Sequence, residues 1–261
     1  MGKITDALRK AAEHRVEHIE KINRIKEHDA FVVKKMEDSV VDPRIITYFD
    51  SKAAISEQYK ILRTNILSLN KNNPPKVMVV TSSTHSEGKT ITSLNLAIAI
   101  VQSKSTHKVL LIDADMRRGR VARYLGVDQP AGLSELLSGE AELKDVLFNI
   151  DIPNLSFIAA GKVPNQPVDL LDSRAMKEAV AKLRTMYDLI IIDTPPIISV
   201  TDAGIAGALS DGVLMVIQAG RTQRGIIRHA EELLYQAHAT VLGHVLTNIE
   251  YHLPEYIYRY L

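Results

Sequence analysis

A run of small and polar residues lies directly between two apolar segments. The segment before it, Val77–Thr81, is an uninterrupted apolar run typical of a buried strand, and Thr90–Gln102 has the pattern of a helix. A loop of this kind can wrap phosphate oxygens with its backbone N–H groups and aim the positive end of a helix at them. We interpret it as a nucleotide-phosphate loop, made of Ser83, Thr84, His85, Ser86, Glu87, Gly88, Lys89 and Thr90. In this loop Lys89 would reach the outer phosphates and the Thr90 hydroxyl would hold Mg²⁺.

Three aspartates follow two other apolar segments. The predicted strand Val109–Asp113 leads into Asp115, and the predicted strand Leu189–Asp193 ends on its own aspartate. Carboxylates at the carboxyl ends of parallel strands gather at one edge of a sheet, beside the phosphate loop. Asp113 and Asp115 could hold hydrated Mg²⁺ or accept a proton from an attacking hydroxyl, and Asp193 has the position of a metal-organising carboxylate.

The last eleven residues hold four of the nine tyrosines, Tyr251, Tyr256, Tyr258 and Tyr260. Chain ends are accessible to a neighbouring molecule, so these phenols could be phosphate acceptors. They could equally pack as an aromatic edge on the sheet or on a partner. The sequence leaves both interpretations open.

Apolar segments alternate with helical patterns over most of the chain. This alternation predicts a doubly wound α/β fold with a mainly parallel sheet and helices on both faces. Further strands are expected at Leu155–Ala159, Val213–Gln218 and Leu242–Asn248, and further helices at Ser173–Met186 and Ile226–Ala237. Ahead of the phosphate loop we expect a short strand at Arg44–Tyr48 and a helix at Ser56–Leu69, with a packing stripe of Tyr59, Leu62, Ile66 and Leu69.

The amino-terminal segment differs from the rest. Apolar residues recur at helical spacing from Ile4 to Lys26, which predicts an amphipathic helix that docks on its own domain, on another chain or on lipid. Its polar face carries both charge signs, which weakens the lipid interpretation. We predict three parts: helix and linker over 1–43, the nucleotide domain over 44–250, and the tyrosine-rich tail over 251–261.

Composition narrows the class of protein. The 261 residues are 46% hydrophobic with a formal net charge of +1, and there is no cysteine. These values fit a globular protein and exclude disulfides and thiolate metal sites. No apolar run reaches the ~18 residues that span a bilayer, and the amino terminus lacks the pattern of a signal peptide. We therefore expect a cytoplasmic protein. We interpret the basic residues Arg221, Arg224 and Arg228 as a solvated face and predict no nucleic-acid partner.

Taken together, the motifs resemble those of the bacterial tyrosine kinases, a branch of the MinD-like P-loop class. The resemblance covers Arg44 to Leu261: a Walker A loop at Ser83–Thr90, an Asp-x-Asp-x-Arg motif at Asp113, Asp115 and Arg117, and a Walker B motif from Asp193 to Pro196. It implies an autokinase that uses ATP and Mg²⁺. The metal would lie on Thr90, Asp113 and Asp193, and the adenine on Asn248. Lys89, Asp113 and Asp115 would be catalytic.

The resemblance also implies partners. The tail of one subunit would enter the site of the next in a ring or dimer, with Glu57, Lys60 and Arg63 at the interface. Lysine stands at position 60 where the family has arginine, so the planar fork that pairs carboxylates bidentately is lost. A membrane protein of the polysaccharide co-polymerase or adaptor kind would recruit the kinase to the inner face of the membrane. The kinase would regulate capsule or exopolysaccharide polymerisation and export.

The phosphate loop departs from the family pattern at two positions. His85 and Ser86 stand where relatives have Pro-Gly, and Ser86 would be strained if its φ must be positive. An alternative function is a ParA- or MinD-like positioning ATPase, or a nucleotide-gated scaffold without kinase activity. The loop lacks the signature lysine of the positioning ATPases at Thr84, which favours the kinase.

Overall fold

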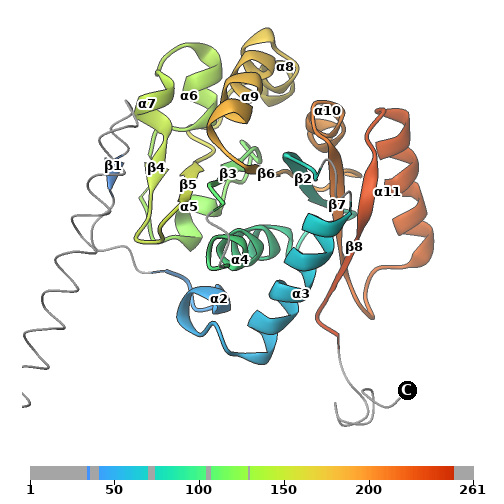
Figure 1. Ribbon diagram of the computed structural model, residues 1–261. Coiled ribbons are helices and arrows are strands. Elements are labelled where there is room, and N and C mark those ends of the chain that lie inside the picture. Colours follow the sequence, from blue (N-terminus) through green and yellow to red (C-terminus); the bar gives the residue numbers. More distant parts are fainter. Residues whose placement is uncertain (1–33, 36–40, 70–73, 104–106, 129, 250–261) are drawn as a thin grey trace, which may run out of the picture. The chain divides into compact units, whose positions relative to one another are not determined.

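The computed structural model describes residues 34–35, 41–69, 74–103, 107–128 and 130–249 (Figure 1). Contacts divide the chain into Met1–Val33 and Lys34–Leu261. The predicted helix Ile4–Lys26 and the four tail tyrosines lie outside the described residues. The domain limits 1–43, 44–250 and 251–261 stay predictions.

An eight-stranded sheet forms the centre of the fold, in the order β1-β4-β5-β3-β6-β2-β7-β8. Every neighbouring pair is parallel except β4 and β5, which confirms the mainly parallel sheet. The strands are β1 (Lys34–Lys35), β2 (Val77–Ser82), β3 (Val109–Asp113), β4 (Phe148–Asn149), β5 (Leu155–Ile158), β6 (Leu189–Asp193), β7 (Gly212–Gln218) and β8 (Val241–Thr247).

Helices cover both faces of the sheet, as the doubly wound prediction requires (Figure 1). On one face α4 contacts β2, β3 and β6, with α2 and α3 packed outside it; α9 and α10 cover the other face. The helices are α2 (Ile46–Phe49), α3 (Ala54–Ser68), α4 (Lys89–Val101), α5 (Val121–Tyr124), α6 (Leu133–Ser138), α7 (Leu143–Val146), α8 (Pro167–Leu171), α9 (Arg174–Met186), α10 (Asp202–Ala208) and α11 (Arg224–Gln236).

The central strands are buried along their whole length, which explains their uninterrupted apolar sequence. All six predicted strands from Val77 onward and all four predicted helices from Ser56 onward are present, with ends within two residues of those expected. The edge strand β8 is only partly buried. Within the described ranges no helix combines the length and the apolar character that a membrane span requires.

Two predictions ahead of the phosphate loop are wrong. Residues 44–48 do not form a strand, because Asp42 accepts the Arg44 N–H in a tight turn that leads into helix α2. Ile45 and Thr47 are buried instead, and Thr47 donates its N–H to Asn95 Oδ1 of α4 at 3.0 Å. Leu69, expected on the packing stripe of α3, follows the helix end and is 50% exposed.

Asp211 closes the amino-terminal end of the central strand β2. Its Oδ2 accepts the backbone N–H groups of Lys76 (2.8 Å) and Val77 (2.7 Å), and Arg184 donates to both carboxylate oxygens. Burial raises the pKa of Asp211, but the bonds from Arg184 and the two backbone donors lower it by more, so the net pKa lies below its ordinary value.

We predict that Asp211→Asn lowers the free energy of unfolding by about 1–2 kcal/mol at pH 7. This loss is smaller than for a fully buried carboxylate, because solvent screens the partly exposed side chain. The amide would place an NH₂ group against Arg184. Because the folded pKa is lowered, the carboxylate stabilises the fold fully above its ordinary pKa of 3.8 and loses this contribution as pH falls through the folded value. Urea unfolding at pH 7 and pH 3 measures the difference in the free energy of unfolding between the variant and the wild type. The exposed Asp172→Asn is the control, and an Asp211→Asn deficit that is the same at both pH values would contradict the prediction.

Candidate functional site

The phosphate loop leaves β2 and enters α4 with two residues in the left-handed region of backbone space. Gly88 has φ 93° and is the residue just before α4 begins, while Ser86 has φ 65°. Glycine adopts such angles freely, whereas a serine there is strained. Ser86 therefore has the positive φ that was expected to strain it. His85, the other departure from the family pattern, lies 3.3 Å from the Ser199 hydroxyl.

The two residues at the start of α4 point to the aspartates. Lys89 Nζ lies 3.2 Å from Asp115 Oδ2 and 3.5 Å from Asp193 Oδ2. The Thr90 hydroxyl donates to Asp193 Oδ2 at 2.6 Å. The fold thus brings together the loop lysine, the loop threonine and two of the strand-end aspartates, although they come from three separate segments of the sequence.

Asp113 and Asp115 differ in what they bind. Asp113 accepts backbone N–H groups from Asp115 (3.1 Å), Arg120 (2.8 Å) and Val121 (2.9 Å), so it fixes the turn after β3. Asp115 accepts the Arg118 N–H and faces Lys89. Asp113 is also the register partner of Asp193 on the neighbouring strand β6.

Electrostatics at the site follow from burial and crowding. Burial raises the pKa of Asp113 to about 7, and the nearby charge of Asp193 adds to the increase. Burial also raises the pKa of Asp193, against the opposing effect of Lys89. Burial lowers the pKa of Lys89, but Asp193, Asp115 and Asp113 together raise it above its ordinary value. The site therefore holds its lysine charged and favours a cation next to its carboxylates.

The residues predicted to bind adenine and to form the subunit interface lie at the end of β8 and on α3. Asn248 is exposed at the end of β8, with φ 52°. On α3, Lys60 bonds to Glu57 (2.7 Å) and to the Ser51 carbonyl, while Arg63 donates to the Ala99 carbonyl of α4 (2.8 Å). The tyrosines Tyr251, Tyr256, Tyr258 and Tyr260 lie outside the described residues.

Sequence reasoning missed two residues beside the aspartates. The Ser93 hydroxyl, one turn into α4, donates to Asp193 Oδ1 at 3.1 Å. Asp202, which begins α10, is buried and lies 3.6 Å from Arg117, its only ion-pair partner within the described ranges. Burial raises the pKa of Asp202, while Arg117 opposes this. The available signals were a serine one helical turn after Lys89 and an aspartate in the first turn of a helix that follows β6.

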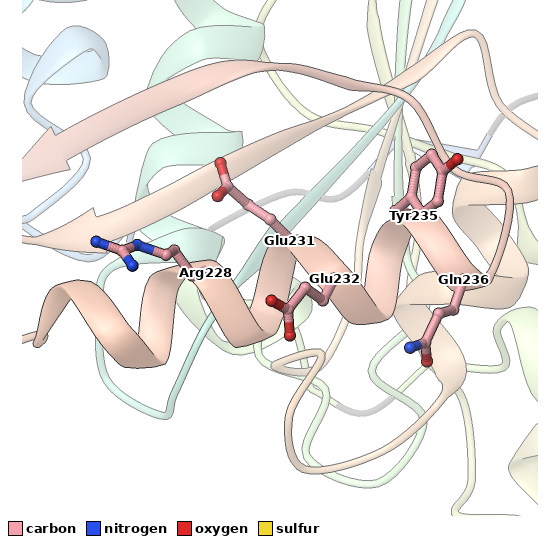
Figure 2. A pocket seen from close by; sticks show the side chains of 5 residues that line it. All are labelled: Arg228, Glu231, Glu232, Tyr235 and Gln236. Atoms are coloured by element: carbon pink, nitrogen blue, oxygen red, sulfur yellow. The ribbon is translucent and has the colours of Figure 1, made fainter.

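An open depression on the surface is unrelated to this site. All of its lining residues belong to helix α11: Arg228, Glu231, Glu232, Tyr235 and Gln236 (Figure 2). Glu231 also bonds to His244 of β8 at 2.9 Å, and Tyr235 is 81% exposed. No residue of the phosphate loop and none of the three strand-end aspartates lines it.

We predict that Ser86→Gly raises the free energy of unfolding by about 0.5–1 kcal/mol, because glycine relieves the left-handed strain. Urea unfolding without nucleotide measures this change. The control Gln58→Gly, at an exposed position inside helix α3, should instead lose about 0.5–1 kcal/mol. A loss at Ser86 as large as that at Gln58 would show that the loop does not strain the serine.

Three proteins similar to this chain indicate its family. Tyrosine-protein kinase YwqD of Bacillus subtilis is 33% identical over 82% of this chain and 90% of its own length. A putative tyrosine-protein kinase, EpsB of Ralstonia nicotianae, is 37% identical over 74% of this chain, which corresponds to 26% of that longer protein. The kinase domain of Escherichia coli tyrosine kinase ETK has a TM-score of 0.72 and 30% identity, over 80% of this chain and 83% of that one.

The family model described as an AAA domain matches residues 76–235, which include the phosphate loop and all three strand-end aspartates. The sequence match, the parallel sheet and the cluster of Lys89, Asp115 and Asp193 all indicate a P-loop nucleotide-binding domain. This chain belongs to the bacterial tyrosine kinase family, within the P-loop nucleotide-binding class.

Proposed function

We propose that this kinase transfers the γ-phosphoryl group of ATP to tyrosines in its own carboxyl-terminal cluster. The observation that carries the proposal is the convergence of Lys89 with Asp115 and Asp193 behind a phosphate loop. In the reaction the phenol oxygen bonds to the γ-phosphorus, the bond to the β-phosphate oxygen breaks, and the phenol proton leaves. A carboxylate close to that oxygen would receive the proton.

The residues present fit ATP with Mg²⁺. Lys89 would neutralise the β- and γ-phosphates, and the loop N–H groups at the start of α4 would bind their oxygens. Thr90, Asp193 and Asp113 would hold Mg²⁺, which supplies charge neutralisation when bound. Across the described part of the chain no three His, Asp or Glu side chains form a metal site by themselves. Mg²⁺ usually takes one or two carboxylates together with phosphate and water.

Asp115 is the better placed proton acceptor of the two aspartates in its motif. Asp113 already accepts three backbone N–H groups, which hold it to the turn after β3. Asp115 keeps one oxygen next to Lys89, whose position between the aspartates would also align the γ-phosphate. Asn248, at the end of β8, would bind the adenine.

The acceptor tyrosines would come from a neighbouring subunit. Tyr251, Tyr256, Tyr258 and Tyr260 follow β8 at the carboxyl end of the chain, and each phosphate would add roughly −1.5 to −2 charges to the tail. Several such tails in one assembly would repel each other and loosen it. Glu57, Lys60 and Arg63 on α3 would form the subunit interface. Since Arg63 binds the Ala99 carbonyl of α4, an interface that recruits Arg63 acts directly on the helix that begins with Lys89.

A membrane protein would activate the kinase and recruit it from the cytoplasm to the inner face of the membrane. The kinase-like region is about a quarter of the longer relative EpsB, which supports a function coupled to a further polypeptide. The family resemblance assigns that partner to the polysaccharide co-polymerases and their adaptors. The kinase would accordingly regulate capsule or exopolysaccharide polymerisation and export.

We predict that ATP and Mg²⁺ place phosphate on the tail tyrosines of the wild-type protein but not on those of Lys89→Met, because the variant cannot neutralise the outer phosphates. Mass spectrometry of the carboxyl-terminal peptide measures it. Lys89→Met mixed with an active protein whose four tail tyrosines are phenylalanine should regain phosphate if transfer occurs between subunits. A tail that stays unmodified even with a membrane partner's cytoplasmic segment would favour a positioning ATPase or scaffold.

We predict that Asp115→Asn slows tail phosphorylation by about 10²–10⁴-fold, the usual contribution of a general base. Binding of a fluorescent ATP analogue should change far less, since asparagine keeps the size of the side chain. Rates from timed phosphopeptide analysis test this. Phosphorylation at the wild-type rate would remove Asp115 from the catalytic residues.

A further inference from the structure

We infer that the hydroxyl groups of Thr222 and Thr247 hold the phosphate loop in shape through Glu87, and that both are positioning residues for ATP. This inference rests on the proposed function for the role of the loop. Both threonines lie outside the motifs that the sequence brings to attention, Thr222 between β7 and α11 and Thr247 at the end of β8.

Glu87 is a buried carboxylate inside a loop whose task is to receive anionic phosphates. Its side chain is 1% exposed, and Oε2 accepts the Thr84 N–H at 2.7 Å while Oε1 accepts the Thr222 hydroxyl. In the described part of the chain no lysine, arginine or histidine forms an ion pair with it. A buried charge without a counter-charge depends on its hydrogen bonds, so the Thr222 hydroxyl is one of very few groups that keep Glu87 folded into the loop.

Thr247 supports the same loop from the sheet. Its hydroxyl donates to the Glu87 carbonyl at 2.8 Å, and its methyl carbon would lie 3.5 Å from a Cβ on Gly88. Gly88 is the left-handed residue that turns the chain into α4. Thr247 thus fixes the peptide that joins Glu87 to Gly88, directly ahead of the catalytic Lys89.

The contact of Thr247 attaches the loop to a partly exposed edge strand of the sheet. Strand β8 is partly exposed along its length, and Thr247 is its last residue, next to Asn248. Beyond Ile249 the chain continues into the tyrosine cluster. Because the strand that supports the loop also carries the tail, the order of the phosphate loop depends on how firmly β8 pairs with β7.

The test uses Thr222→Val and Thr247→Val, which remove the hydroxyl and keep the shape, beside Thr222→Ser and Thr247→Ser, which keep the hydroxyl. Thr185→Val, on an exposed part of α9, is the matched control. Hydrogen exchange of a peptide covering residues 82–88 reports loop order without nucleotide. We expect exchange about 5- to 20-fold faster in both valine variants, corresponding to one lost hydrogen bond to a charged or buried group.

Kinetics give the second readout. The KM for ATP should rise about 5- to 20-fold in the valine variants while kcat changes less than about 3-fold. The reason is that part of the ATP binding energy must then order the phosphate loop. The serine variants and Thr185→Val should match the wild type. Unchanged exchange and unchanged KM in both valine variants would overturn the inference. If Thr247→Val does not fold, Thr222→Val decides, since that residue lies in a partly exposed connection.

The two hypotheses can fail separately. Faster exchange in the valine variants, in a protein whose wild-type tail takes up no phosphate even with a membrane partner's cytoplasmic segment, would support the positioning role and reject the autokinase. Tail phosphorylation with no effect of either valine variant on exchange or KM would do the reverse.

Discussion

Lys89 lies between Asp115 and Asp193, at 3.2 and 3.5 Å, and this shared ion pair constrains the surrounding structure. With Asp113, the site contains three buried carboxylates and one ammonium group. Charges withdrawn from water in this way are stable only if hydrogen bonds satisfy their remaining oxygens. Ser93, Thr90 and the turn after β3 supply those donors. Burial raises the pKa of Asp113, and the nearby charge of Asp193 adds to the increase. The excess of carboxylates makes the site suitable for a cation.

The parallel sheet is what forces the carboxylates together. Asp113 and Asp193 are register partners on β3 and β6, and β6 is also paired with β2, which leads into the phosphate loop. Since all three strands run in the same direction, their carboxyl ends meet at one edge. The apolar residues of the strands are buried by helices on both faces, so the polar side chains are confined to the strand ends.

The sequence could predict the parts of this site that are formed by neighbouring residues in the chain. The phosphate loop is recognised from Gly88-Lys89-Thr90 after an apolar strand, and the carboxylates from aspartates at the ends of two other strands. Neither prediction requires knowledge of contacts between distant residues. The sequence predicts a strand where the short helix α2 forms, because α2 is held by packing on α4 and by the bond from Thr47 to Asn95, 48 positions away. Thr222 meets Glu87 across 135 positions, and Asp202 meets Arg117 only once α10 has packed against β2. Single hydroxyl and carboxyl groups of this kind carry no periodicity that could reveal them.

Helix α4 connects the phosphate site to the surface on which assembly would act. Its first residue is Lys89, and the preceding turn is held by Thr247 through the Glu87 carbonyl. Near its other end the Ala99 carbonyl accepts the Arg63 guanidinium, a favourable place for a cation because the helix dipole is negative there. A helix bonded at both ends transmits displacement more readily than it absorbs it, since a packed core is not continuously deformable. Any neighbour that took Arg63 away from Ala99 would therefore remove one contact that holds the far end of the helix that positions Lys89.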